Sequence, residues 1–129
     1  MNVATHDLPC EASTPMRARR WAAGCLYALL GDAPGAGALI DDAVLCVSEL
    51  VTNAVQAGCS AISLRLRIDQ DVVRISIIDD ASGHPTPRAA GPNDPTGRGL
   101  RLVEALTRRW GVDPAASGKE VWAEIARTG

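Results

Sequence analysis

Three short segments of this 129-residue chain hold side chains that could bind and activate a ligand. The first contains Glu49 and Asn53, which lie four residues apart and would share one face of a helix. A carboxylate there could orient or deprotonate a nucleophile, and an amide oxygen could bind Mg²⁺, which prefers oxygen ligands. The alternative is a solvated helix face shared with Asp42 and Gln56, and helical periodicity alone favours that alternative.

The second segment begins with an acid at the end of a strand. The apolar face of this predicted strand carries Val73, Ile75 and Ile77. By strand alternation Asp79 lies on the same face, where an acid needs a partner such as the exocyclic amine of adenine. The alternative is a strand-terminal aspartate that begins a turn. The next residue, Asp80, points the other way and is expected to be solvated.

The third segment places Gly97 and Gly99 just before a predicted helix. Glycines let the backbone approach phosphates, and a helix N-terminus supplies free N–H groups and a partial positive charge. The alternative is an ordinary glycine loop, which is common. The segment matches neither GxGxxG nor GxxxxGK[ST], which argues against a Rossmann domain or a P-loop. Together, and in this order, the three segments predict a site for ATP and Mg²⁺.

The elements expected around these segments form an α+β fold. Apolar residues at helical spacing predict helices, and alternating apolar residues predict the strands of a mainly antiparallel mixed sheet. Because the strands have one wet face, we expect helices on one face only, which gives a two-layer α/β sandwich. Residues 1–14 would be an N-terminal extension or edge strand, and residues 15–129 a single ATP-binding domain. The expected helices are residues 15–30, 38–57 and 100–109, and the expected strands are residues 3–8, 62–68, 73–77, 110–114 and 120–126.

Composition limits the classes of partner and compartment. Hydrophobic residues make up 47% of the chain, which is enough for a core. The formal net charge of -2 gives no electrostatic reason to expect nucleic acid or an anionic membrane as a partner. We find no apolar run of the roughly 18 residues that a membrane span needs, and no signal-peptide pattern at the N-terminus. The expected compartment is therefore the cytoplasm.

The four cysteines, at positions 10, 25, 46 and 59, form no CxxC pair and no zinc pattern with the two histidines. Cys25, Cys46 and Cys59 lie among apolar residues, where cysteine behaves as a small hydrophobe. We therefore expect free thiols rather than a metal site or a disulfide.

In their order, the three segments resemble the motifs of the GHKL, or Bergerat-fold, ATP-binding superfamily of gyrases, histidine kinases and anti-sigma-factor kinases. Residues 48–55 (SELVTNAV) resemble its N box, residues 79–85 (DDASGHP) its G1 box, and residues 97–103 (GRGLRLV) its G2 box. The short single-domain form and residues 118–123 (GKEVWA) resemble the actinobacterial anti-sigma serine/threonine kinases. The resemblance spans residues 15–126 and implies a Bergerat fold.

The resemblance implies a role for each motif. Glu49 would be the general base, Asn53 the Mg²⁺ ligand, and Asp79 the acid that binds the N6 amine of adenine. Residues 86–96 would form a lid over ATP. The remaining nucleotide-binding positions would be Ala81 and Gly83 near the base and Thr96, Gly97, Arg98, Gly99 and Leu100 near the phosphates.

Two positions depart from the superfamily pattern, and one register stays open. Gln56 stands near where a basic residue often follows the N box. Ala81 stands where the G1 box usually has its first glycine. A second register would take Asp80 as the adenine acid. We prefer Asp79, because Gly83 and Pro85 then fall at the usual offsets and the strand alternation agrees.

The resemblance implies an ATP-dependent serine/threonine protein kinase. It would transfer the γ-phosphoryl group to an anti-anti-sigma (STAS-type) protein, could also sequester a sigma factor, and could form a homodimer. A second hypothesis is a nucleotide-dependent binding module that clamps a partner and transfers nothing. A third is an interaction domain that binds no nucleotide, which would not explain the joint order of the motifs. Glu49 favours the kinase, because only phosphoryl transfer needs a base there.

Overall fold

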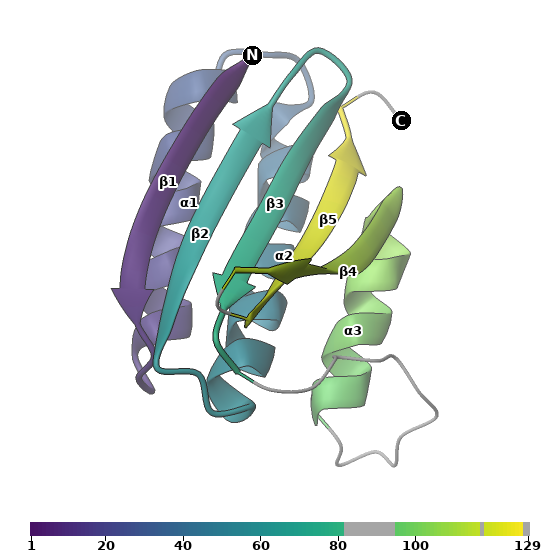
Figure 1. Ribbon diagram of the computed structural model, residues 1–129. Helices are drawn as coiled ribbons and strands as arrows, with labels where there is room; N and C mark the ends of the chain where they lie inside the picture. Colours follow the sequence, from purple (N-terminus) through teal and green to yellow (C-terminus); the bar gives the residue numbers. More distant parts are fainter. Residues whose placement is uncertain (82–94, 117, 128–129) are drawn as a thin grey trace.

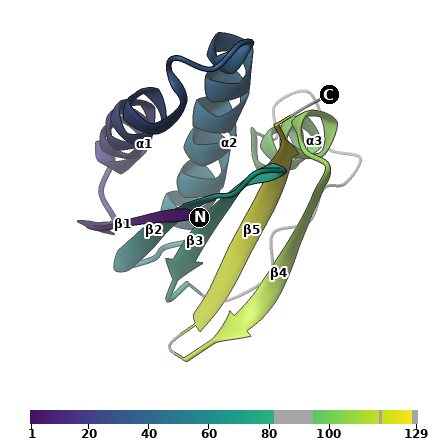
Figure 2. The same cartoon turned by 90° about the horizontal axis from the view of Figure 1, so that it is seen from above.

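The computed structural model describes residues 1–81, 95–116 and 118–127. The described residues form three helices packed on one face of a five-stranded sheet (Figure 1), and the two layers are seen from above in Figure 2. This is the predicted two-layer α/β sandwich. None of the described helices is long and apolar enough to cross a membrane. The elements are β1 (Asn2–Pro9), α1 (Thr14–Leu30), α2 (Ala36–Gln56), β2 (Ala61–Ile68), β3 (Val72–Asp79), α3 (Pro95–Leu106), β4 (Arg109–Ala115) and β5 (Gly118–Ala126).

The sheet has the strand order β1-β2-β3-β5-β4, and every pairing between these strands is antiparallel. β5 lies beside β3, although α3 and β4 separate the two strands in the chain. This arrangement sets the first residues of β5 against the last residues of β3, where Lys119 is directly opposite Asp79. The end of β3 therefore receives side chains from a distant part of the sequence.

Strand alternation and small helix residues build the core. On α1, Ala18, Ala22 and Leu26 recur every four residues and are fully buried, so the helix can approach its neighbours closely. The predicted apolar faces of β2 and β3 are confirmed, because no side chain on them is more than 3% exposed. These side chains are Ile62, Leu64, Leu66, Ile68, Val73, Ile75 and Ile77.

Helix α3 begins earlier than the sequence predicts. It starts at Pro95 rather than Leu100 and ends at Leu106. Proline is favoured in the first helical turn, because its missing N–H would have no partner there. Gly97 and Gly99 therefore lie inside the first turns of the helix, and the prediction that they precede it is wrong.

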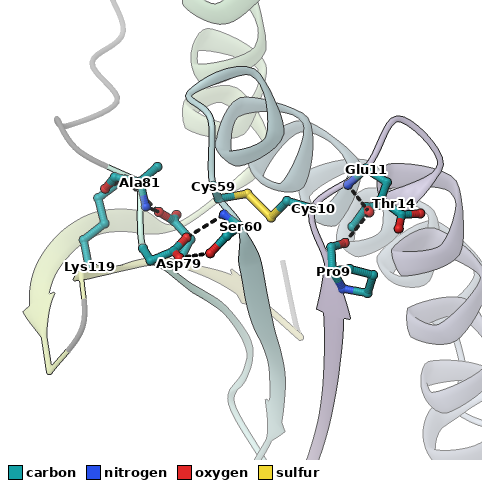
Figure 3. Close-up of a disulfide and its surroundings, with 10 residues drawn as sticks. Pro9, Cys10, Glu11, Thr14, Cys59, Ser60, Asp79, Ala81 and Lys119 are labelled. Carbon is teal, nitrogen blue, oxygen red and sulfur yellow. Dashed lines mark hydrogen bonds and ion pairs between the residues drawn. A yellow bond between two sulfur atoms is a disulfide. The ribbon is translucent and has the colours of Figure 1, made fainter.

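The prediction of free thiols is wrong for two cysteines, because Cys10 and Cys59 form a disulfide (Figure 3). The β1–β2 register places Pro9 opposite Ala61, and the backbone N–H of Cys10 donates to the carbonyl oxygen of Ser60 (3.0 Å). The two cysteine Cα atoms are consequently 5.8 Å apart, within the range that a disulfide requires. Their separation of 49 residues hides this proximity in the sequence.

The other two cysteines, Cys25 and Cys46, are free, as predicted. Cys46 is fully buried in α2. Burial, with smaller contributions from the negative charges of Asp42 and Glu49, raises the pKa of the Cys46 thiol to about 12. This thiol stays protonated near neutral pH and is a weak nucleophile.

The sheet face away from the helices carries a charge cluster around Glu124. Its carboxylate accepts hydrogen bonds from Arg109 (2.7 Å) and Arg74 (3.1 Å), and Arg67 lies 3.8 Å away. Arg74 also stacks on Trp122, with its guanidinium carbon 4.3 Å from the ring centroid. The hydrogen bond from Arg109, followed by that from Arg74, holds the pKa of Glu124 below its usual range, although burial opposes this.

The disulfide predicts a thiol count and a loss of stability. The unfolded, unreduced protein should expose two reactive thiols, and the reduced protein four. Replacing Cys10 and Cys59 together by serine should lower the free energy of unfolding by about 2–4 kcal/mol, because the cross-link restricts the unfolded chain. Thiol titration and urea unfolding measure both effects, with Cys25→Ser as the control. Four thiols before reduction, or unchanged stability in the double variant, would contradict the disulfide.

Glu124 predicts a pH dependence of stability. Its pKa is lower in the folded than in the unfolded protein, so its contribution is complete above the unfolded value of about 4.3 and is lost as the pH falls through the lower folded value. Glu124→Gln should therefore lower stability at pH 7 by about 1–3 kcal/mol and flatten the acid side of the stability profile. Denaturant unfolding between pH 3 and pH 7 measures this. An unchanged acid slope would show that the arginines do not stabilise the carboxylate.

Candidate functional site

Three elements converge at one end of the sandwich, at the lower end of Figure 1. They are the last turns of α2, the end of β3 and the start of α3, and α3 packs against α2. These are the elements that carry the three segments identified in the sequence, so the fold brings the segments to a common end of the molecule.

Gly99 of α3 lies against Glu49 of α2. A Cβ atom added at Gly99 would lie 2.5 Å from Oε2 of Glu49, which is closer than van der Waals contact allows. Oε2 of Glu49, at the end of a flexible side chain, therefore lies beside the first turns of α3, where a residue larger than glycine would displace it. The first and third sequence segments meet at this contact.

Asn53 follows Glu49 by one turn of α2 and is buried, with 9% of its surface exposed. Its Nδ2 atom is buried and has no hydrogen-bond partner. A buried N–H donor without an acceptor is unfavourable, and a bound ligand with an acceptor oxygen could relieve that cost. Helical periodicity favours a solvated face here, and that prediction is wrong for Asn53. Glu49 is half-buried. Both residues are covered because other elements pack against α2.

Asp79 is buried on the helix-facing side of β3, as strand alternation predicts. Its Oδ1 accepts hydrogen bonds from the backbone N–H of Ala81 (2.8 Å) and from Nζ of Lys119 (2.9 Å). Nζ of Lys119 also donates to the carbonyl oxygen of Ala81 (3.0 Å). Figure 3 shows these three residues close together, on the far side of Ser60 from Cys10. The partner that a buried acid requires is thus supplied in this structure by a lysine.

Lys119 has no role among the sequence-based predictions. Two signals could have found it. It is the only lysine of the chain, and it shares the phase of Val121, Ala123 and Ile125, which are the buried apolar residues of β5. A lysine on the core face of a strand needs a buried acceptor, and only the β3–β5 register identifies that acceptor as Asp79.

Asp80 has a different environment from its neighbour. It is exposed, and it accepts hydrogen bonds from the backbone N–H of Ser60 (2.8 Å) and from the Ser60 hydroxyl. The hydroxyl makes the larger contribution, and together the two bonds lower the pKa of Asp80. Asp80 therefore ties the end of β3 to the turn between α2 and β2.

Ala81, which replaces the usual glycine, is accommodated. It is buried, and no non-glycine residue among the described ones has a positive φ, so the position does not need glycine's conformational freedom. Gly83 and residues 86–94 of the predicted lid lie outside the described residues. The last two positions of that lid, Pro95 and Thr96, begin α3 instead.

The predicted phosphate-binding positions form the first turns of α3. The first N–H groups of a helix have no partner within it and can bind an anion. Leu100 is fully buried, so the start of the helix is anchored in the core. These positions are Thr96, Gly97, Arg98, Gly99 and Leu100.

Comparisons with known proteins agree with this architecture. A sequence model of the histidine kinase-like ATPase domain matches residues 2–125. No curated protein sequence matches the chain. Among solved structures, that of the RsbU and RsbW domains of Rv1364c from Mycobacterium tuberculosis is 20% identical, with a TM-score of 0.67. The alignment covers 100% of this chain and 34% of that one, so this chain spans about a third of its length. At this identity the likeness concerns the fold.

Two further structures come from the blue-light activated histidine kinase EL346 of Erythrobacter litoralis. Its histidine kinase domain is 24% identical, with a TM-score of 0.48, and the alignment covers 67% of this chain and 43% of that one. The second structure of the kinase is 26% identical, with a TM-score of 0.48 and coverages of 67% and 30%. The family match, which spans nearly the whole chain, confirms the predicted GHKL resemblance. The chain belongs to the histidine kinase-like ATPase family, a membership that implies ATP binding.

Proposed function

We propose that this chain is an ATP-dependent serine/threonine protein kinase that phosphorylates an anti-anti-sigma (STAS-type) protein. The contact between Glu49 and Gly99 carries the proposal, because it holds a carboxylate beside the helix start where phosphates would bind. The substrate class rests on the motif resemblance to anti-sigma kinases, and the RsbW domain named in the similar structure supports it.

The base would bind at the end of β3. Asp79 is buried there and accepts hydrogen bonds from N–H donors, which is also how it would hold the exocyclic amine of adenine. Asp80 is a poorer candidate, because it is exposed whereas Asp79 is buried. Ala81 would border the base through its backbone, and Gly83 would do so by resemblance.

The phosphates would bind at the first turns of α3. Their negative charge suits the free N–H groups and the positive end of the helix dipole. Thr96, Gly97 and Arg98 would offer their free N–H groups there. Gly99 and Leu100 lie beyond the first four helix positions and would border the phosphates, as the resemblance implies. Residues 86–96 would act as the lid.

Asn53 would hold Mg²⁺ through its amide oxygen. The amide oxygen suits this role by its chemistry, and the residue is buried one turn from the Glu49 carboxylate. Its Nδ2 atom, which has no partner, is a donor and would need an acceptor such as a phosphate oxygen. Amide and carboxylate oxygens are the hard ligands that Mg²⁺ takes, together with water. When bound, the ion would neutralise negative charge on the phosphates.

Glu49 would act as the general base. It would accept the proton of a serine or threonine hydroxyl while that oxygen bonds to the γ-phosphorus and the bond to the bridging oxygen breaks, leaving ADP. The Glu49 carboxylate lies beside the phosphate-binding turn, close to Gly99. Sequestration of a sigma factor and a homodimer complete the proposal by resemblance, and the cytoplasmic location is the one expected from the sequence.

A first prediction of the proposed function compares two neighbouring acids. Asp79→Asn should weaken ATP binding at least about tenfold, because a hydrogen bond to a charged group contributes about 1.5–3 kcal/mol. Asp80→Asn should change ATP binding much less and should act on stability through Ser60. Calorimetric titration of both variants measures this, with thermal melting to confirm folding. A larger loss of ATP affinity in Asp80→Asn than in Asp79→Asn would show that Asp80, not Asp79, is the adenine-binding acid.

The second prediction separates kinase from clamp. Glu49→Ala should leave ATP binding nearly intact and reduce phosphoryl transfer by about 10²–10⁴, the usual effect of losing a general base. Radiolabel transfer from ATP to STAS-type proteins measures the rate, and Glu104→Ala on the exposed face of α3 is the matched control. Transfer at the parental rate would remove Glu49 from the mechanism. ATP binding without transfer by the parent would replace the kinase with the non-catalytic clamp.

A further inference from the structure

The ion pair between Lys119 and Asp79 occupies the position where the base amine is proposed to bind. The side chain of Asp79 is 1% exposed and that of Lys119 is 9% exposed, so the pair is almost completely enclosed. Nζ of Lys119 donates to Oδ1 of Asp79 and to the carbonyl oxygen of Ala81. A nitrogen donor of this chain therefore already occupies Asp79.

An adenine amine and a lysine ammonium are both N–H donors, and they compete for the same acceptor. Oδ1 of Asp79 accepts from Nζ of Lys119 and from the backbone N–H of Ala81. While Lys119 remains there, an amine at position 6 of a purine that approaches this oxygen meets another donor rather than a free acceptor. A purine with an oxygen at position 6 presents an acceptor, and the ammonium can donate to it. Lys119 should therefore weaken the binding of 6-amino purines and strengthen the binding of 6-oxo purines.

Building on the proposed function, we propose that Lys119 is a specificity-determining residue of the base pocket. Its ammonium must leave Oδ1 of Asp79 before an adenine amine can donate to that oxygen, whereas it can stay and donate to the position-6 oxygen of a 6-oxo purine. Lys119 consequently lowers the preference of this site for adenine over 6-oxo purines. It acts from β5, a strand distant in sequence from the three motif segments.

The test compares ATP with inosine triphosphate (ITP), which differs at position 6, by measuring Kd for the parent and for Lys119→Met. Methionine keeps most of the apolar stem and removes the ammonium. ATP should bind more tightly to the variant and ITP more weakly, which raises the ITP-to-ATP ratio of Kd by about tenfold, the effect of one hydrogen bond to a charged group. A purely structural defect would move both affinities in the same direction.

Arg74→Met is the matched control. Arg74 lies on the same strand as Asp79 and pairs with the buried Glu124, but on the opposite face of the sheet. It should leave the ratio unchanged. A ratio in Lys119→Met within about twofold of the parental one would overturn the specificity role. If neither nucleotide binds to any of the proteins, the proposed function itself fails, and the inference fails with it.

A second measurement uses the unaltered protein, because Lys119→Met leaves a buried carboxylate without its partner and could unfold. Lys119 is the only lysine, so amine acylation followed by peptide mapping reports on this single ammonium. The α-amine of the exposed Met1 provides the internal reference. ATP should raise the acylation rate of Lys119 about tenfold relative to Met1, and ITP should not. If ATP lowers the acylation rate of Lys119 or leaves it unchanged, ATP does not displace Lys119 from Asp79, and the proposal is overturned.

Discussion

A carboxylate buried at the end of a core strand must be given donors, and the candidate site is organised around that requirement at Asp79. The turn after β3 returns the N–H of Ala81 to the carboxylate, and β5 brings Lys119 to it from the opposite side. Breaking such a buried pair by removing one partner costs about 3–5 kcal/mol. An acid can therefore be placed in this part of the core only because β5 returns beside β3. The exposed Asp80 also holds the turn after β3, through its hydrogen bonds with Ser60.

Local patterns predict the parts of the fold that depend on neighbouring residues. Alternation along β3 places Ile75, Ile77 and Asp79 on one face, and the structure buries all three. Local patterns do not predict the disulfide. The approach of Cys10 to Cys59 depends on how β1 pairs with β2, and the two cysteines are 49 residues apart in the sequence. The start of α3 is missed for a different reason: proline and glycine usually interrupt helices, yet Pro95 is acceptable in a first turn.

The site shows the same division between local and tertiary information. The order of the motifs predicts that Glu49 and Gly99 belong to one site, and the two residues are in contact. Helical periodicity places Asn53 on a solvated face, but the structure buries this residue. The prediction fails because no pattern within α2 reveals that α3 packs against α2. Lys119 lies in the core phase of β5, but its acceptor is visible only once the strand order is known.

A structure of the chain with Mg²⁺ and a non-hydrolysable ATP analogue tests most directly whether the three segments form one nucleotide site. The account predicts the adenine amine within hydrogen-bond distance of Asp79, the triphosphate at the first turns of α3, and the metal on the amide oxygen of Asn53. It also predicts Nζ of Lys119 away from Asp79. A nucleotide bound elsewhere, or an adenine on Asp80, would contradict the account.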